Sequence, residues 1–247
     1  MADPTSKQRL TKAERKEEAK RQRVELQRKM ATTRRNRRIA MGVVMALVVV
    51  VGAYALTRPQ EARADPQELL ATVDQARETA GCGAVEDVGP YQPRSSDRSH
   101  IVAQLPLSTY PSVPPASGPH NAIPFGAGVY STPPPMDRVI HSLEHGAAVV
   151  WYSPDASGPQ LERIRSFYEG EAGVGNRVIV APYDYPDQGA AGSLPGGAQM
   201  ALVAWHKVQT CASVNLAAAF GFTSSYAARP FGDRPYRGEA PEAGGAF

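Results

Sequence analysis

An uncharged apolar run of 18 residues, 39–56, constrains this chain of 247 residues more than any other feature. As a helix it would be roughly 27 Å long, which is close to the hydrocarbon thickness of a bilayer, about 30 Å. A helix is also the one single-segment structure that satisfies its own backbone hydrogen bonds in lipid. The run therefore predicts a transmembrane helix. A cleaved signal peptide is the less favoured alternative, because the charged leader before the run is long for a signal.

The charges of the chain are divided unequally by this run. Residues 1–38 carry 14 of the 27 Lys and Arg and 5 of the 24 acidic residues, a net charge of +9, whereas residues 39–247 have a net charge of −6. The basic cluster ends directly before the apolar run, so the positive-inside rule predicts a cytoplasmic tail over 1–38 and an extracytoplasmic remainder. We therefore expect a single-pass membrane protein with the membrane, or a membrane-protein complex, as its partner.

Nucleic acid is not an expected partner of the basic leader. No aromatic residue is interleaved with its Lys and Arg residues, so it offers no platform on which the bases of a single strand could stack.

The rest of the chain divides by composition. Residues 57–81 predict a linker and an amphipathic helix, residues 82–228 an extracytoplasmic domain, and the Pro- and Gly-rich residues 229–247 a flexible tail. Within the domain, residues 90–135 are rich in Pro but too apolar for a disordered linker, so we expect ordered loops that wrap the domain.

Regular structure is expected from residue 136 onward. The patterns predict a short helix over 137–145, a buried strand over 147–152, a helix over 157–167, strands over 177–183 and 199–210, and a helix over 213–227. This order of strands and helices predicts an α+β fold with one small sheet.

The two cysteines, Cys82 and Cys211, both follow the apolar run. In an oxidising compartment such a pair is more often a disulfide than a metal site or a catalytic pair. We therefore expect the two to be joined.

The histidines carry the chemistry. Four of the five lie within 46 residues, at His100, His120, His141 and His145. His141 and His145 share one face of a helix at spacing i, i+4, so their imidazoles could hold Zn or Cu as a pair. The other two could complete the coordination. The fifth, His206, adjoins Trp205 in a predicted strand and is left out of the site.

Glu144 allows a different interpretation of the same helix. The pattern HxxEH (141–145) is also the signature of inverzincin peptidases, in which the Glu activates water. A metal-dependent hydrolase that uses Glu144 as a base is therefore possible, although a helix of about eight residues is short for that family. A further alternative is that the histidines are hydrogen-bonded core residues without any metal.

Several segments together resemble a known family. They are RSHIV (98–102), YPSVPPASGPH (110–120), GVYSTPPP (128–135), HSLEHGAAVVWY (141–152), VIVAPY (178–183) and ALVAWHKV (201–208). Over roughly residues 80–225 the chain is similar to the bacterial membrane-anchored family catalogued as domain of unknown function 3105. The chain departs from the family pattern at Ala116, where Thr is usual, and at His206, where a small residue is typical. The resemblance implies a bacterial cell membrane protein and no established activity.

These observations favour a non-catalytic, metal-binding module that holds a transition metal through His100, His120, His141 and His145. Copper is slightly favoured over zinc because all-imidazole sites suit Cu(II), and Met136 could add a soft ligand for Cu(I). Glu144 would then orient an imidazole as an outer partner. The alternative from another class is a structural or interaction subunit of an envelope complex without metal.

Overall fold

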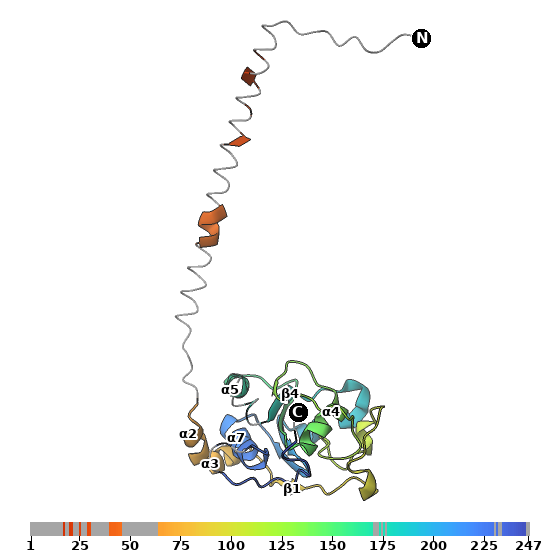
Figure 1. Ribbon diagram of the computed structural model, residues 1–247. Coiled ribbons are helices and arrows are strands. Elements are labelled where there is room, and N and C mark those ends of the chain that lie inside the picture. Colours follow the sequence, from red (N-terminus) through yellow and green to blue (C-terminus); the bar gives the residue numbers. More distant parts are fainter. Residues whose placement is uncertain are drawn as a thin grey trace, which may run out of the picture. The chain divides into compact units, whose positions relative to one another are not determined.

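The computed structural model describes residues 64–169, 173, 175, 177–229, 231 and 234–245, together with 17, 20, 21, 25, 29, 30 and 40–45. The chain divides into two compact units, Met1–Glu61 and Ala62–Phe247. The second unit holds the sheet (Figure 1) and, by residue number, all five histidines.

The predicted transmembrane helix is not supported. Among the described residues, no helix has both the length and the apolar character that crossing a membrane requires. Residues 40–45 are helical and exposed, but six residues would span only about 9 Å; residues 39 and 46–56 lie outside the described residues. Three predictions depended on this span: the single-pass fold, the membrane as partner and the membrane localisation. None of them is supported.

The α+β part of the fold prediction is confirmed. A six-stranded mixed sheet has the strand order β1-β6-β5-β3-β4-β2. Its strands are β1 (Glu86–Asp87), β2 (Gly128–Val129), β3 (Ala148–Tyr152), β4 (Val178–Pro182), β5 (Met200–Ala204) and β6 (Lys207–Cys211). β3, β4 and β2 pair in parallel, and the other neighbours pair antiparallel.

The described α-helices are α2 (Pro66–Ala71), α3 (Val73–Thr79), α4 (Met136–Glu144), α5 (Pro159–Tyr168) and α7 (Leu216–Tyr226). Short 3₁₀ turns η1 (Arg94–Ser96), η2 (Leu107–Thr109), η3 (Pro186–Gly192) and η4 (Pro195–Gly197) lie in the loops. The single helix expected within 57–81 is two helices, divided at Thr72.

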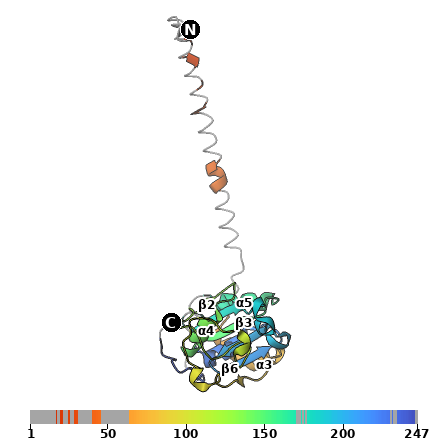
Figure 2. The same cartoon turned by 90° about the vertical axis from the view of Figure 1, so that its right-hand side faces the viewer.

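The sheet has two differently covered faces, because side chains alternate along each strand. Val150 and its alternate neighbours enter a core with α2, α3, α5 and α7, here called the helical face. Val149, Trp151 and the intervening side chains enter a second core with α4 and the Pro-rich loops, here called the histidine face. Figure 1 shows α4 and α7 on opposite sides of the sheet, and in the view of Figure 2 α4 overlies the strands.

The segment 199–210 is not the single strand that its apolar pattern predicted. It folds back on itself as the antiparallel pair β5 and β6, joined at Trp205 and His206. His206 takes a positive φ of 58°, a conformation that suits a tight turn. The apolar pattern continues through the turn because Trp205 is itself buried.

The Pro-rich region 90–135 is ordered, as expected, and covers the histidine face. Leu107 and Ala116 are fully buried in that core, and β2 adds an edge strand to the sheet. The expected disulfide is confirmed: Cys82, which follows α3, is bonded to Cys211 at the end of β6.

The C-terminal segment 234–245 lies against the domain rather than forming the loose tail that we expected. The Arg237 amide donates to the Ser225 carbonyl at 2.7 Å, and the Glu242 amide donates to the Glu144 carbonyl at 3.0 Å. The Arg177 guanidinium also donates to the Gly245 carbonyl at 2.6 Å. The segment therefore reaches the end of α4.

Candidate metal centre

Three imidazoles and one carboxylate converge on the histidine face. His100, His120, His141 and Glu144 each offer one ligand atom, and these atoms all lie within 4.8 Å of one another. His100 is exposed, whereas the other three are buried. The group therefore lies near the surface with one histidine facing solvent.

Two loop segments bring His100 and His120 side by side. The Ile101 amide donates to the His120 carbonyl at 2.8 Å, and the His120 amide donates to the Ser99 carbonyl at 3.0 Å. These two bonds form an isolated parallel bridge between His100 and His120. The ring centroids are 5.2 Å apart as a result.

Gly118 is required by the path of the second loop. Its φ is 125°, and a Cβ atom there would come within 2.8 Å of the Tyr110 ring. Only glycine adopts this conformation without strain. The turn directs the Gly118 carbonyl back to His120, whose Nδ1 lies 2.7 Å away.

Backbone carbonyls fix the tautomers of two imidazoles. His120 Nδ1 donates to the Gly118 carbonyl, and His141 Nδ1 donates to the Asn121 carbonyl at 2.6 Å. Since a carbonyl oxygen can only accept, each ring carries a proton on Nδ1, so Nε2 holds a lone pair when the ring is neutral and a second proton when it is charged. His120 Nε2 is buried without a hydrogen-bond partner, although Glu144 Oε2 lies 3.0 Å away.

Glu144 is held as a buried carboxylate by Arg98. Arg98 Nε donates to Glu144 Oε1 at 2.5 Å, and Arg98 Nη2 donates to Glu242 Oε1 at 2.7 Å. Burial would raise the pKa of Glu144, but the contacts with His120 and Arg98 outweigh it and lower the pKa to about 2. Glu144 is therefore ionised at neutral pH.

His141 is favoured in its neutral form. Burial lowers the pKa of its imidazole, although the hydrogen bond to the Asn121 carbonyl opposes this effect. A neutral ring keeps the Nε2 lone pair that a metal ligand needs.

His145 takes a different place from the one predicted. It is the C-cap residue of α4 and is not among the four converging residues. Its Nε2 lies 2.8 Å from His141 Nε2 and 3.4 Å from Glu242 Oε2. The expected set of four histidines is thus brought together as three histidines and Glu144, with His145 beside His141.

Met136 and His206 lie in other surroundings. Met136, at the start of α4, is fully buried in the apolar core and lies about 140° around the helix from His141. His206 Nε2 lies 2.9 Å from Asp97 Oδ2. Asp97 also accepts a hydrogen bond from the Ser117 hydroxyl. Asp97 therefore lies between Ser117 and His206, whereas in a nucleophilic triad the histidine lies between the serine and the acid.

Two residues of the site were missed by sequence analysis. Arg98 precedes His100 by two positions, and a charged residue so close to a candidate ligand could have been predicted to lie near the site. Glu242 lies 144 positions after Arg98 in the sequence, and nothing local distinguishes it from other acidic residues of the tail.

The comparison with protein families gives one match. The sequence model of a family described as protein of unknown function, DUF3105, matches residues 106–243, more than half of the chain. Searches of curated proteins and of solved structures find no significant match. The chain belongs to the DUF3105 family, as its resemblance indicated, and the bacterial source implied by that resemblance stays a prediction.

Proposed function

We propose that this DUF3105 protein binds one divalent transition metal ion, Zn(II) or Cu(II), through His100, His120, His141 and Glu144. One observation carries the proposal: two imidazoles are each held at Nδ1 by a backbone carbonyl, and they converge with His100 and a buried, ionised carboxylate so that the ligand atoms lie within 4.8 Å of one another. A metal-bound histidine commonly donates its other ring N–H to a carbonyl or carboxylate, which fixes the ring and its tautomer.

The donor set and its spacing support the proposal. Imidazole nitrogen and carboxylate oxygen are ordinary ligands of Zn(II), and imidazole suits Cu(II) as well. With metal–ligand bonds of about 2.0–2.1 Å, two neighbouring ligands of one ion lie about 2.9–3.4 Å apart. The distance of 3.0 Å between His120 Nε2 and Glu144 Oε2 falls in this range.

The choice between copper and zinc is left to experiment. Copper was favoured for a site of imidazoles alone, but Glu144 adds an oxygen donor to the group. The reason for preferring copper therefore no longer applies in full. Cu(II) nevertheless binds most nitrogen-rich sites more tightly than Zn(II).

The hydrolase alternative is weakened by the same contacts. A general base works best with a pKa near the working pH, whereas contacts with His120 and Arg98 lower the pKa of Glu144 to about 2 against the effect of burial. Moreover, α4 ends at Glu144, so the motif occupies the last turn of a nine-residue helix.

A structural role is the second candidate, and a specific observation favours it. The hydrogen bonds of His120 to Gly118 and of His141 to Asn121 tie Pro-rich loops in place without any ion. Metal binding by the purified protein separates the two candidates.

The test is a titration of metal-free protein with Zn(II) and Cu(II) in the presence of a competing chelator. Wild-type protein should bind one ion per chain. His141→Ala should weaken binding by about 100-fold or more, and His100→Ala, an exposed position with little risk to folding, by about tenfold or more. Cu(II) should also quench the fluorescence of Trp205, whose ring lies 6.3 Å from that of His120.

His206→Asn is the matched control, because it removes a histidine outside the site and Asn tolerates the positive φ at that position. Its metal affinity should equal that of the wild type. Equal binding by His141→Ala and wild-type protein would end the metal proposal in favour of the structural role.

A further inference from the structure

A hollow of about 180 Å³ lies away from the histidines, between α3, β6, α7 and the C-terminal segment. Three arginines line it: Arg77 from α3, and Arg234 and Arg237 from the C-terminal segment. Phe222 and Tyr226 of α7 supply an aromatic wall. Segments far apart in the sequence thus bring three positive charges to one enclosed place.

Among the described residues, these arginines have no carboxylate partner. In the described part of the chain, the side chains of Arg77 and Arg237 form no ion pair or hydrogen bond. Arg234 makes one contact, from Nη2 to the Ser225 hydroxyl at 3.2 Å. By contrast, Arg98 and Lys207 each pair with two carboxylates, so acidic partners are plentiful elsewhere in this domain.

The charge balance of the hollow calls for an anion. Among the described residues that line it, Asp74, which is exposed, is the one acid, so three positive charges face one negative charge there. Like charges gathered in a partly enclosed space repel each other unless an anion neutralises them. The planar fork of a guanidinium matches the oxygens of a carboxylate or a phosphate.

We infer that this hollow is a binding site for a small oxyanion with two or more negative charges, such as a phosphate or a polycarboxylate. A hollow of this volume has room for more than one water molecule and therefore for a small anion. The aromatic wall gives the carbon skeleton of a polycarboxylate a surface to pack on.

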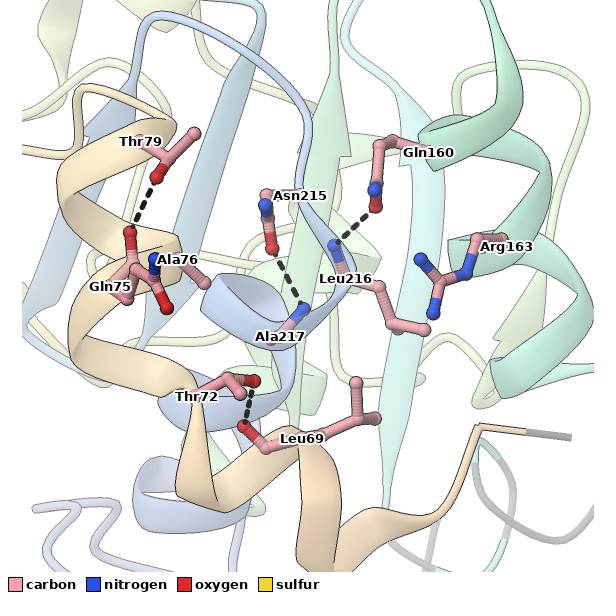
Figure 3. A pocket seen from close by; sticks show the side chains of 10 residues that line it. All are labelled: Leu69, Thr72, Gln75, Ala76, Thr79, Gln160, Arg163, Asn215, Leu216 and Ala217. Carbon is pink, nitrogen blue, oxygen red and sulfur yellow. Dashed lines mark hydrogen bonds between the residues drawn. The ribbon is translucent and has the colours of Figure 1, made fainter.

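A second hollow in the same unit differs in its charge and serves as a comparison. It has a volume of about 250 Å³, lies among α2, α3, α5 and α7, and is drawn in Figure 3. Among the described residues that line it, Arg163 is the one cation, and it is exposed. The first amides of α7 already donate to Asn215 and Gln160. Among the described residues, this larger hollow therefore has no cluster of arginines, and Arg163 provides a control.

Anion binding would have a mechanical consequence. Arg77 belongs to a helix held by the adjacent disulfide, whereas Arg234 and Arg237 belong to the C-terminal segment. An anion that contacts both sides would hold this segment against the domain. The inference rests on the arginines and is independent of metal binding.

The experiment is a calorimetric titration of metal-free, full-length protein with inorganic phosphate, tricarballylate and acetate. Phosphate or tricarballylate should bind at one site per chain and acetate much more weakly. Arg77→Gln and Arg237→Gln should each weaken binding by about tenfold, since each removes charge-assisted hydrogen bonds. The order of the two affinities shows whether the natural ligand is a phosphate or a carboxylate.

Arg163→Gln is the matched control and should bind as the wild type does. The bound anion should also slow amide hydrogen exchange in residues 234–245. Arg237 is exposed, so its substitution leaves folding intact and gives a clear result. The site is refuted if Arg77→Gln and Arg237→Gln bind like the wild type, if Arg163→Gln loses as much affinity, or if none of the anions binds.

Discussion

The two faces of the sheet are built on different physical principles. The core of the helical face consists of apolar side chains such as Leu202 and Phe220, and the buried Thr223 of α7 is hydrogen-bonded to Tyr168. The histidine face has an apolar core as well, around Trp151, but it also buries His120 and Glu144. A buried polar group costs free energy unless it has a partner, so the second face depends on specific contacts where the first depends on packing.

Irregular backbone explains why the imidazoles lie on the loop-covered face. In helices and strands the carbonyl groups are occupied by regular hydrogen bonds, whereas loop carbonyls accept from other donors. Gly118 and Asn121, which orient His120 and His141, are both in the Pro-rich region. The loops therefore supply acceptors that a covering helix would not.

The largest effect should come from the disulfide on the helical face. Replacement of Cys82 and Cys211 by Ser opens a link across 129 residues, which should lower the free energy of unfolding by about 4–5 kcal/mol in the chain-entropy model. The loss should be the same with and without metal. Urea unfolding under both conditions measures it, and a loss confined to the metal-loaded protein would contradict the separation of the faces.

A cavity on the helical face should have a somewhat smaller effect. Phe220→Ala removes a ring that is 1% exposed and packs on Phe167 at 5.2 Å, so the free energy of unfolding should fall by about 3–5 kcal/mol. The metal affinity of the folded protein should stay unchanged. Val102→Ala on the other side, at a residue 98% exposed, is the control and should change stability by less than about 0.5 kcal/mol.

Metal should stabilise the protein through the histidine face alone. At a free metal concentration about 100 times the Kd, wild-type protein should gain about 2.7 kcal/mol of unfolding free energy. Phe220→Ala should gain as much, whereas His141→Ala should gain little or nothing. The comparison fails if metal stabilises His141→Ala as strongly as the wild type.

The smallest of these effects should follow the loss of Arg98. Arg98→Gln removes the cation that holds Glu144 as an anion, so metal affinity should fall by about tenfold, or about 1.4 kcal/mol. Arg94→Gln, in the same loop, changes an exposed residue of η1 and serves as the control. Equal affinities of the two variants would show that Arg98 has no part in positioning Glu144.

Much of the fold could be predicted because its signals are local. Short continuous apolar runs indicated β3 and β4, and the presence of only two cysteines left one possible disulfide. The helix over 137–145 was displaced only slightly, since α4 begins at Met136 with Pro135 as its cap. The apolar run 39–56 is the contrary case, since its predicted span is not supported among the described residues.

The amino-acid sequence dictates which residues can act as ligands, whereas the packing of loops and tail selects which of them meet. Spacing along a helix placed His141, Glu144 and His145 on one side, but α4 ends at Glu144, so His145 caps the helix beside the group. The contact of Arg98 with Glu242 joins residues 144 positions apart. Such a pair depends on how loops and tail pack on the sheet, and side-chain periodicity describes only the face of a single element.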